Sequence, residues 1–120
     1  RAYASMMNTL NAECIEPLIA DDFIYESQQV FQPLESKEEF LEYIHGKLET
    51  IRRVKASVFA EIGTVDDFRQ NQPCVILAQN DRDNLVGLAL AQTEGEFLKR
   101  IDLCVIPAPQ SAKRSGEYPA

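Results

Sequence analysis

The sequence has no tryptophan, a single histidine, few glycines and no long uncharged hydrophobic run. A membrane-spanning helix needs about 20 consecutive apolar residues, so the missing run argues against a membrane protein. Basic residues are also scarce: 12 Lys and Arg stand against 19 Asp and Glu, a formal net charge of 12 − 19 = −7. This excess of acid argues against nucleic acid and anionic membranes as partners. Hydrophobic residues nevertheless make up 45% of the 120 residues, which excludes intrinsic disorder and predicts one folded domain.

Metal-binding and redox motifs are absent as well. The three cysteines, Cys14, Cys74 and Cys104, lie far apart and form no CxxC pair. His45 is the only histidine, and the carboxylates do not cluster at the spacing of metal ligands. We therefore expect no metal and no cofactor. An odd number of unpaired cysteines is typical of buried, reduced thiols, which indicates a cytoplasmic protein.

The clearest element that is present is a helix beginning after Ser36. Ser36 and Glu39 have the spacing of a capping box, in which the hydroxyl and the carboxylate satisfy free amides at the start of a helix. The apolar residues that follow repeat at helical spacing over three turns: Phe40, Leu41, Ile44, Leu48 and Ile51. Before this helix, residues 2–20 have a helical pattern with a break expected at Pro17, and residues 22–27 have the composition of a short strand.

After the helix, apolar residues alternate with polar ones, which predicts β-strands. The predicted strands cover residues 54–62, 73–80, 85–92 and 96–106. We expect a polar loop over residues 64–72 and a loosely ordered tail over residues 108–120. Helices followed by consecutive long strands predict an α+β fold, with N-terminal helices packed on a curved, mostly antiparallel sheet.

The last predicted strand has two different faces. Ile101, Leu103 and Val105 share one face, whereas Arg100 and Asp102 share the other. If the helices cover the face with Arg100 and Asp102, the more apolar face needs a partner. A homodimer formed through this outer sheet face is the simplest such partner.

The order of these elements, together with the segment Leu-Ile-Ala-Asp-Asp-Phe-Ile-Tyr-Glu-Ser at residues 18–27, resembles the nuclear-transport-factor-2-like superfamily. That group includes ketosteroid isomerase, scytalone dehydratase and SnoaL-like polyketide cyclases. The resemblance extends from about Tyr3 to Ile106 and implies a single cone-shaped, cystatin-like domain over residues 1–107. It does not imply one function, because this fold carries unrelated chemistries.

The resemblance also implies positions for a site inside the cone. It places Ser27 where the ketosteroid isomerases have their general-base aspartate, and Gly87 where they have a protonated aspartate. A serine hydroxyl and a glycine cannot replace these groups, so both differences argue against isomerase chemistry. The same alignment directs Tyr25, Arg100 and Asp102 toward the pocket, beside the small residues of the strand that contains Gly87.

Three of these side chains have two interpretations each. Asp102 interrupts an apolar run and is either a pocket acid–base or the partner of Arg100 in an ion pair. His45 lies at the edge of the apolar helix stripe, so it either reaches the pocket mouth or simply marks the boundary of the core. Tyr25 either donates its hydroxyl to a ligand or packs its ring in the core.

The leading hypothesis is a protein that binds a small, partly apolar molecule inside the cone, with no assignable reaction and no assignable catalytic residue. The expected ligand contacts are Tyr25, Ser27, His45, Gly87, Arg100 and Asp102. A second hypothesis is a lyase, isomerase or cyclase that uses Asp102 or His45 as its acid–base. A third is a protein-interaction module that uses the outer sheet face.

Overall fold

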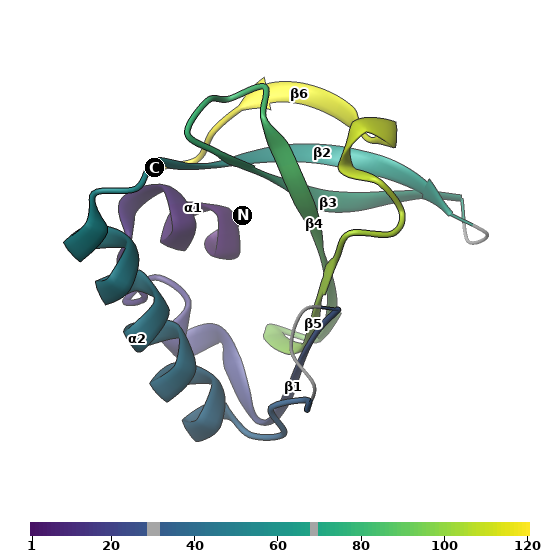
Figure 1. Ribbon diagram of the computed structural model, residues 1–120. Coiled ribbons are helices and arrows are strands. Elements are labelled where there is room, and N and C mark those ends of the chain that lie inside the picture. Colours follow the sequence, from purple (N-terminus) through teal and green to yellow (C-terminus); the bar gives the residue numbers. More distant parts are fainter. Residues whose placement is uncertain (29–31, 68–69) are drawn as a thin grey trace.

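The computed structural model of the chain describes residues 1–28, 32–67 and 70–120. Within these ranges, two α-helices pack on one six-stranded sheet that curves around them (Figure 1). The sheet order is β1-β5-β4-β3-β2-β6, and every neighbouring pair is antiparallel except β1 with β5. The predicted α+β architecture with a curved, mostly antiparallel sheet is therefore confirmed. In chain order the elements are α1 (Ala2–Thr9), η1 (Glu16–Leu18), β1 (Ile19–Ser27), α2 (Lys37–Val54), β2 (Val58–Asp67), β3 (Gln70–Gln79), β4 (Leu85–Glu94), β5 (Phe97–Cys104), η2 (Pro109–Ser111) and β6 (Lys113–Glu117).

Helix α2 begins as the sequence predicts. The Ser36 hydroxyl accepts a hydrogen bond from the Glu39 amide at 3.1 Å. The Glu39 carboxylate accepts from the Glu35 amide at 3.0 Å, one residue earlier than a capping box requires. The Glu39 amide of α2 is thus capped, and the predicted apolar stripe faces the sheet, with Phe40 and Ile44 buried.

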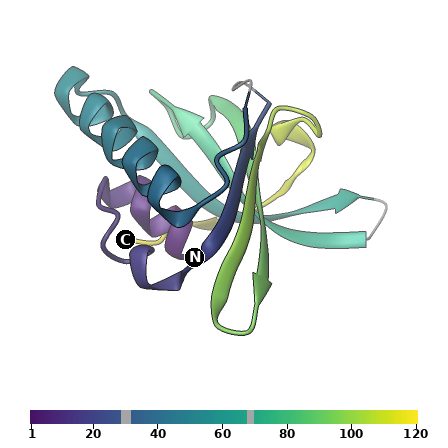
Figure 2. The same ribbon diagram turned by 90° about the horizontal axis from the view of Figure 1, so that it is seen from below.

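The main core lies between the two helices and the concave face of the sheet (Figure 2). Its centre is aromatic: the Phe40 ring lies 4.8 Å from that of Phe23 and 5.3 Å from that of Tyr25, measured between ring centroids. Phe23 and Tyr25 are two residues apart on β1, so both side chains point to the same side of that strand. Helix α2 and strand β1 are therefore held together by ring packing.

The β2–β3 hairpin is longer than predicted. We expected a polar loop over residues 64–72, but the two strands stay paired as far as Asp66 with Asn71 and Asp67 with Gln70. Residues 68 and 69 of the expected loop lie outside the described residues. The prediction of a loop was wrong because backbone hydrogen bonds hold a hairpin together without apolar side chains, and such a polar extension shows no alternation.

The last residues also differ from the expectation of a loosely ordered tail. Residues 113–117 form β6, which pairs with β2 as the edge strand of the sheet. Buried Glu61 on β2 accepts hydrogen bonds from Arg114 Nε and the Gly116 amide, both at 2.8 Å. Asn8 of α1 donates to the carbonyl of Pro119 at 2.8 Å. These bonds join groups more than 50 residues apart in sequence, so local composition could not indicate them.

The two faces of β5 are the reverse of the arrangement that led to the predicted homodimer. Ile101 is buried in the main core and Leu103 packs against it, so the apolar set faces the helices. Arg100 and Asp102 point to the outer face of the sheet. The apolar set faces the helices because burying the more apolar side chains releases more free energy than burying Arg100 and Asp102 would. Dimerisation through the outer face stays a prediction. Ile101 and Leu103 do not support it, because the helices cover them.

Candidate functional site

Two cavities lie against the concave face of the sheet. The first, which we call the Ala89 cavity, has a volume of about 310 Å³ and borders Val75 of β3 and Ala89 of β4. The second, the Gly87 cavity, has a volume of about 330 Å³ and borders Leu77 and Gly87, the next inward residues of the same strands. Each volume is at the lower end of the range for small-molecule sites, which is roughly 300 to 1,000 Å³.

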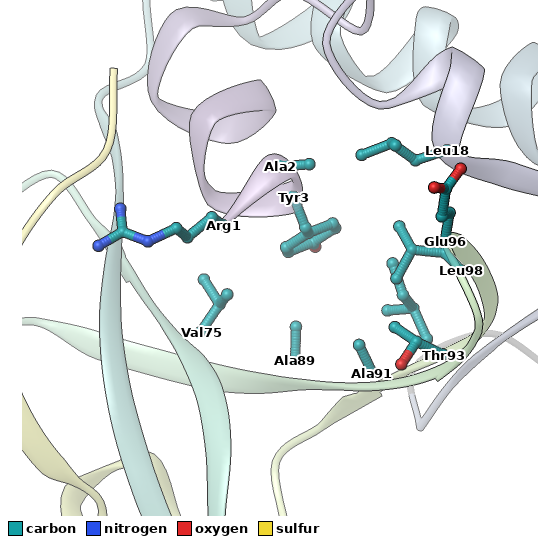
Figure 3. Close-up of a pocket in the computed structure, with 11 residues that line it drawn as sticks. Arg1, Ala2, Tyr3, Leu18, Val75, Ala89, Ala91, Thr93, Glu96 and Leu98 are labelled. Atoms are coloured by element: carbon teal, nitrogen blue, oxygen red, sulfur yellow. The ribbon is translucent and has the colours of Figure 1, made fainter.

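Mostly apolar side chains line the Ala89 cavity (Figure 3). Ala89 and Ala91 form its floor on β4 and leave room because neither side chain extends beyond a methyl group. The ring of Tyr3 extends from α1 over Ala89, and Arg1 and Glu96 lie at opposite sides of the space (Figure 3). The complete lining is Arg1, Ala2, Tyr3, Leu18, Val75, Ala89, Ala91, Thr93, Glu96, Leu98 and Ile101.

Tyr3 contributes the unusual polar group of this region. Its side chain is buried, and its hydroxyl has no hydrogen-bond partner among the described residues. Burial raises the pKa of Tyr3 above its ordinary value, and the nearby phenol of Tyr43 adds to the shift. The pKa of Tyr25 is raised for the same first reason, followed by the influence of Tyr3 and Tyr43. The concave side therefore holds neighbouring phenols that stay protonated, and Tyr3 keeps an unused donor.

The Gly87 cavity lies at the opposite end of the concave face. Gly87 allows a close approach of two strands: a Cβ there would lie 3.2 Å from the backbone oxygen of Cys104, so the strands would have to move apart by a few tenths of an ångström. The pairing of β3 with β4 shifts register between Leu77 and Ala78, which places an extra residue, Val86, in β4. Apart from these residues the lining is Met7, Lys47, Ile51, Val58, Gln79, Leu103 and Val105.

Arg100 and Asp102 form an ion pair on the outer face of the sheet. The guanidinium holds both carboxylate oxygens, Nε to Oδ2 at 2.9 Å and Nη2 to Oδ1 at 2.8 Å. Nη2 also lies 3.1 Å from Glu26 Oε1, and the pKa of Arg100 is raised, chiefly by Asp102. Neither residue lines the two concave cavities. The ion-pair interpretation of Asp102 thus has direct geometric support. Asp102 and Ser27 both border a third, open hollow between β1 and β5, which is separate from the two concave cavities.

The other predicted contacts are also separated. His45 lies on the surface of α2, where its Nε2 is 3.0 Å from Glu16 Oε1 and more than half of the side chain is exposed. Tyr25 is buried against Phe40, as its packing interpretation requires. Of the six expected ligand contacts, Gly87 lines one of the two concave cavities. Ligand binding by the other five stays a prediction.

Sequence reasoning missed three residues that the structure makes important. Tyr3 lies one helical turn from Met7, so a helical stripe could have indicated that it points inward. Lys47 lies four residues before Ile51, at the edge of the α2 stripe, where a long side chain can reach the core. Glu61 carried no signal, because its burial depends on the distant Arg114.

Two absences hold for the described part of the chain, residues 1–28, 32–67 and 70–120. No group of three or more His, Cys, Asp or Glu side chains there is arranged to hold a metal ion. None of the helices described there is long and apolar enough to cross a membrane.

Comparison with known proteins gives a result at the level of the fold. No family model and no curated protein sequence matches the chain. Among solved structures, a candidate polyketide cyclase (protein SMa1630) from Sinorhizobium meliloti is similar, with a TM-score of 0.58 and 13% identity over 86% of this chain and 90% of that one. An NTF2-like protein of unknown function from Cytophaga hutchinsonii has a TM-score of 0.56 and 13% identity, over 88% of this chain and 87% of that one. The chain has the nuclear-transport-factor-2-like fold.

A candidate isomerase from Rhodopseudomonas palustris also shares this fold, with a TM-score of 0.50 and 12% identity over 86% of this chain and 82% of that one. The resemblance inferred from residues 18–27 is therefore confirmed for the fold. Identities of 12% and 13% carry no information about substrate or reaction, because nuclear-transport-factor-2-like proteins share their architecture across different chemistries. Any functional conclusion has to come from the cavities of this chain.

Proposed function

We propose that the protein binds a small, partly apolar molecule in the Ala89 cavity. The observation that supports this proposal is a largely apolar space bordered by Tyr3, whose buried hydroxyl has no partner among the described residues. Small-molecule sites usually combine an apolar lining with a few placed polar groups. The Ala89 cavity has this combination.

The unpaired Tyr3 hydroxyl indicates which ligand group fits. A buried donor without an acceptor costs about 1–3 kcal/mol, and such groups in folded proteins are rare. A phenol with the ordinary pKa of about 10 is protonated at physiological pH, and burial raises the pKa of Tyr3 further, so its hydroxyl can donate to a ligand oxygen. A neutral molecule with an apolar body and one carbonyl oxygen would satisfy this donor and fill the space above Ala89.

The alternative of a lyase, isomerase or cyclase has no specific support from the geometry. Its proposed acid–base groups, Asp102 and His45, are bound to Arg100 and Glu16 outside the concave cavities. Binding without an assigned reaction is therefore the function that we propose.

The proposal can be tested with 2-acetonaphthone, a neutral fluorescent ketone, by equilibrium titration. The wild-type protein should bind it saturably. Ala91→Phe, which fills the cavity from an exposed position, should abolish binding, and Tyr3→Phe should weaken it about tenfold, the value of one hydrogen bond. Ala108→Phe adds the same ring at an exposed site outside the cavity and should have no effect. No saturable binding, or equal binding by all variants, would refute the proposal.

A further inference from the structure

The Gly87 cavity contains a single charged side chain, that of Lys47. Helix α2 contributes Lys47 and Ile51, which are one turn apart, to the same wall. Leu77 and Leu103 form the opposite wall on the sheet. The cavity is therefore amphipathic, with one cation and a lining in which polar and apolar surface are about equal.

Lys47 has no carboxylate partner among the described residues, which is also true of Lys37, Lys55 and Lys113. Its ammonium group instead lies over the ring of Tyr43, whose centroid is 6.0 Å from Nζ. Other basic residues of the sheet, such as Lys99 and Arg114, form ion pairs with acidic side chains. What distinguishes Lys47 is that its half-buried side chain lines the Gly87 cavity. Its local field favours an anion.

The strand opposite Lys47 is irregular at this place. Because Ala78 pairs with Leu85 while Leu77 pairs with Gly87, Val86 is an additional residue in β4 and its side chain borders the cavity. Bulges of this kind change the direction of a side chain and occur often beside binding sites. This irregularity is independent of the charge of Lys47 and lies at the same cavity.

We propose that the Gly87 cavity is a second binding site, which takes an amphipathic monoanion: a short hydrocarbon chain that ends in one carboxylate. The carboxylate binds the ammonium group of Lys47 at the α2 side, and the hydrocarbon lies against Leu77, Val86 and Leu103. The site is separate from the Ala89 cavity, so it does not depend on the function proposed above.

The test uses two probes of equal chain length, octanoate and 1-octanol, titrated calorimetrically into the full chain. Octanoate should bind the wild type saturably, and Lys47→Gln should weaken it about tenfold, as expected for a charge-assisted hydrogen bond. Lys47→Arg should restore most of the affinity. The affinity for 1-octanol should be the same in the wild type and in Lys47→Gln, because the alcohol does not use the charge.

Two further variants control for long-range charge and for location. Arg53→Gln removes the same charge from an exposed position on α2 and should leave octanoate binding unchanged. Val105→Trp places a large ring at an exposed position on the cavity lining and should weaken both probes. Lysine and glutamine have similar helix propensities, so Lys47→Gln is expected to fold.

The proposal is overturned if the wild type shows no saturable octanoate binding, or if Lys47→Gln binds octanoate as tightly as the wild type. It is also overturned if Val105→Trp leaves both affinities unchanged. Binding of 2-acetonaphthone by Lys47→Gln should equal that of the wild type. The two proposed sites can therefore fail independently.

Discussion

Two buried polar groups on opposite sides of the sheet, those of Glu61 and Tyr3, differ in their hydrogen bonding. On the outer face, Glu61 is almost fully buried yet accepts hydrogen bonds from Arg114, Gly116 and Tyr118. On the concave face, the buried hydroxyl of Tyr3 has no partner among the described residues. Glu61 thus belongs to a network that stabilises the fold, whereas the Tyr3 hydroxyl is buried without completing a hydrogen bond among the described residues.

This difference separates structural from functional polar groups. A group whose hydrogen bonds are complete within the chain has little to offer a ligand, even when it is charged. A group left incomplete in an apolar space gains most from a ligand, because water does not reach it easily. By this criterion Tyr3 and Lys47 are better ligand contacts than Arg100 and Asp102.

The largest expected effect is on the concave face, where stability depends on packing. Phe40→Ala should lower the free energy of unfolding by about 3–5 kcal/mol, because it leaves a cavity between β1 and α2. Urea denaturation measures this change. Glu42→Ala, at an exposed position on the same helix, should change stability by no more than about 0.5 kcal/mol. Equal effects of the two variants would contradict the packing described here.

The next largest effect is expected for the outer network. Glu61→Ala removes the shared acceptor of three donors and should destabilise the protein by about 2 kcal/mol. It should also increase hydrogen exchange in β6, since the carboxylate holds the Gly116 amide. Asp66→Ala on the exposed part of β2 is the matched control and should leave β6 protected. Unchanged exchange in β6 would show that backbone pairing alone holds this strand.

The substitution Tyr3→Phe should have an effect of intermediate size. It should change the free energy of unfolding and the affinity for the ketone in opposite directions. Tyr3→Phe removes an unpaired buried donor and should raise the free energy of unfolding by about 1 kcal/mol at neutral pH, although it weakens ketone binding. The native pKa of Tyr3 lies above that of the unfolded phenol, which is about 10. The native state therefore keeps a proton that the unfolded chain loses, and stability should fall as pH rises above about 10.

In Tyr3→Phe the loss of stability at alkaline pH should be smaller than in the wild type, because one phenol with a raised pKa is gone. Some loss should remain, because the pKa of Tyr25 is raised as well. Denaturation curves recorded between neutral and alkaline pH measure the difference. An identical alkaline loss in the variant and the wild type would mean that the Tyr3 phenol ionises normally.

The smallest effect is expected at the ion pair of β5. Asp102→Asn should cost about 0.5 kcal/mol, because Arg100 keeps Glu26 as a partner and both members of the pair are partly exposed. Added salt should reduce this cost further. A loss of several kcal/mol in the same urea experiments would show that Asp102 stabilises the fold at least as strongly as buried Glu61, and more strongly than ordinary surface ion pairs do.

Local patterns predicted much of the fold but little of the site. The stripe from Phe40 to Ile51 and the cap at Ser36 specify α2, because helix periodicity and capping involve residues within a few positions of each other. The face of β5 that meets the helices could not be predicted in the same way. Alternation shows that Ile101 and Asp102 point to opposite sides, but not which side the rest of the chain covers.

By itself the sequence determined the order of the elements, the α+β class and the nuclear-transport-factor-2-like fold, since these depend on local spacing and on segment order. Only the tertiary structure decided that Arg100 and Asp102 lie outside, that Glu61 is buried beneath β6, and that Tyr3 and Lys47 border the concave cavities. These outcomes depend on contacts between residues far apart in the chain. The physical reason is that a side chain becomes buried or hydrogen-bonded only when helices and strands pack together. A local sequence pattern contains one residue of each such contact and not its partner.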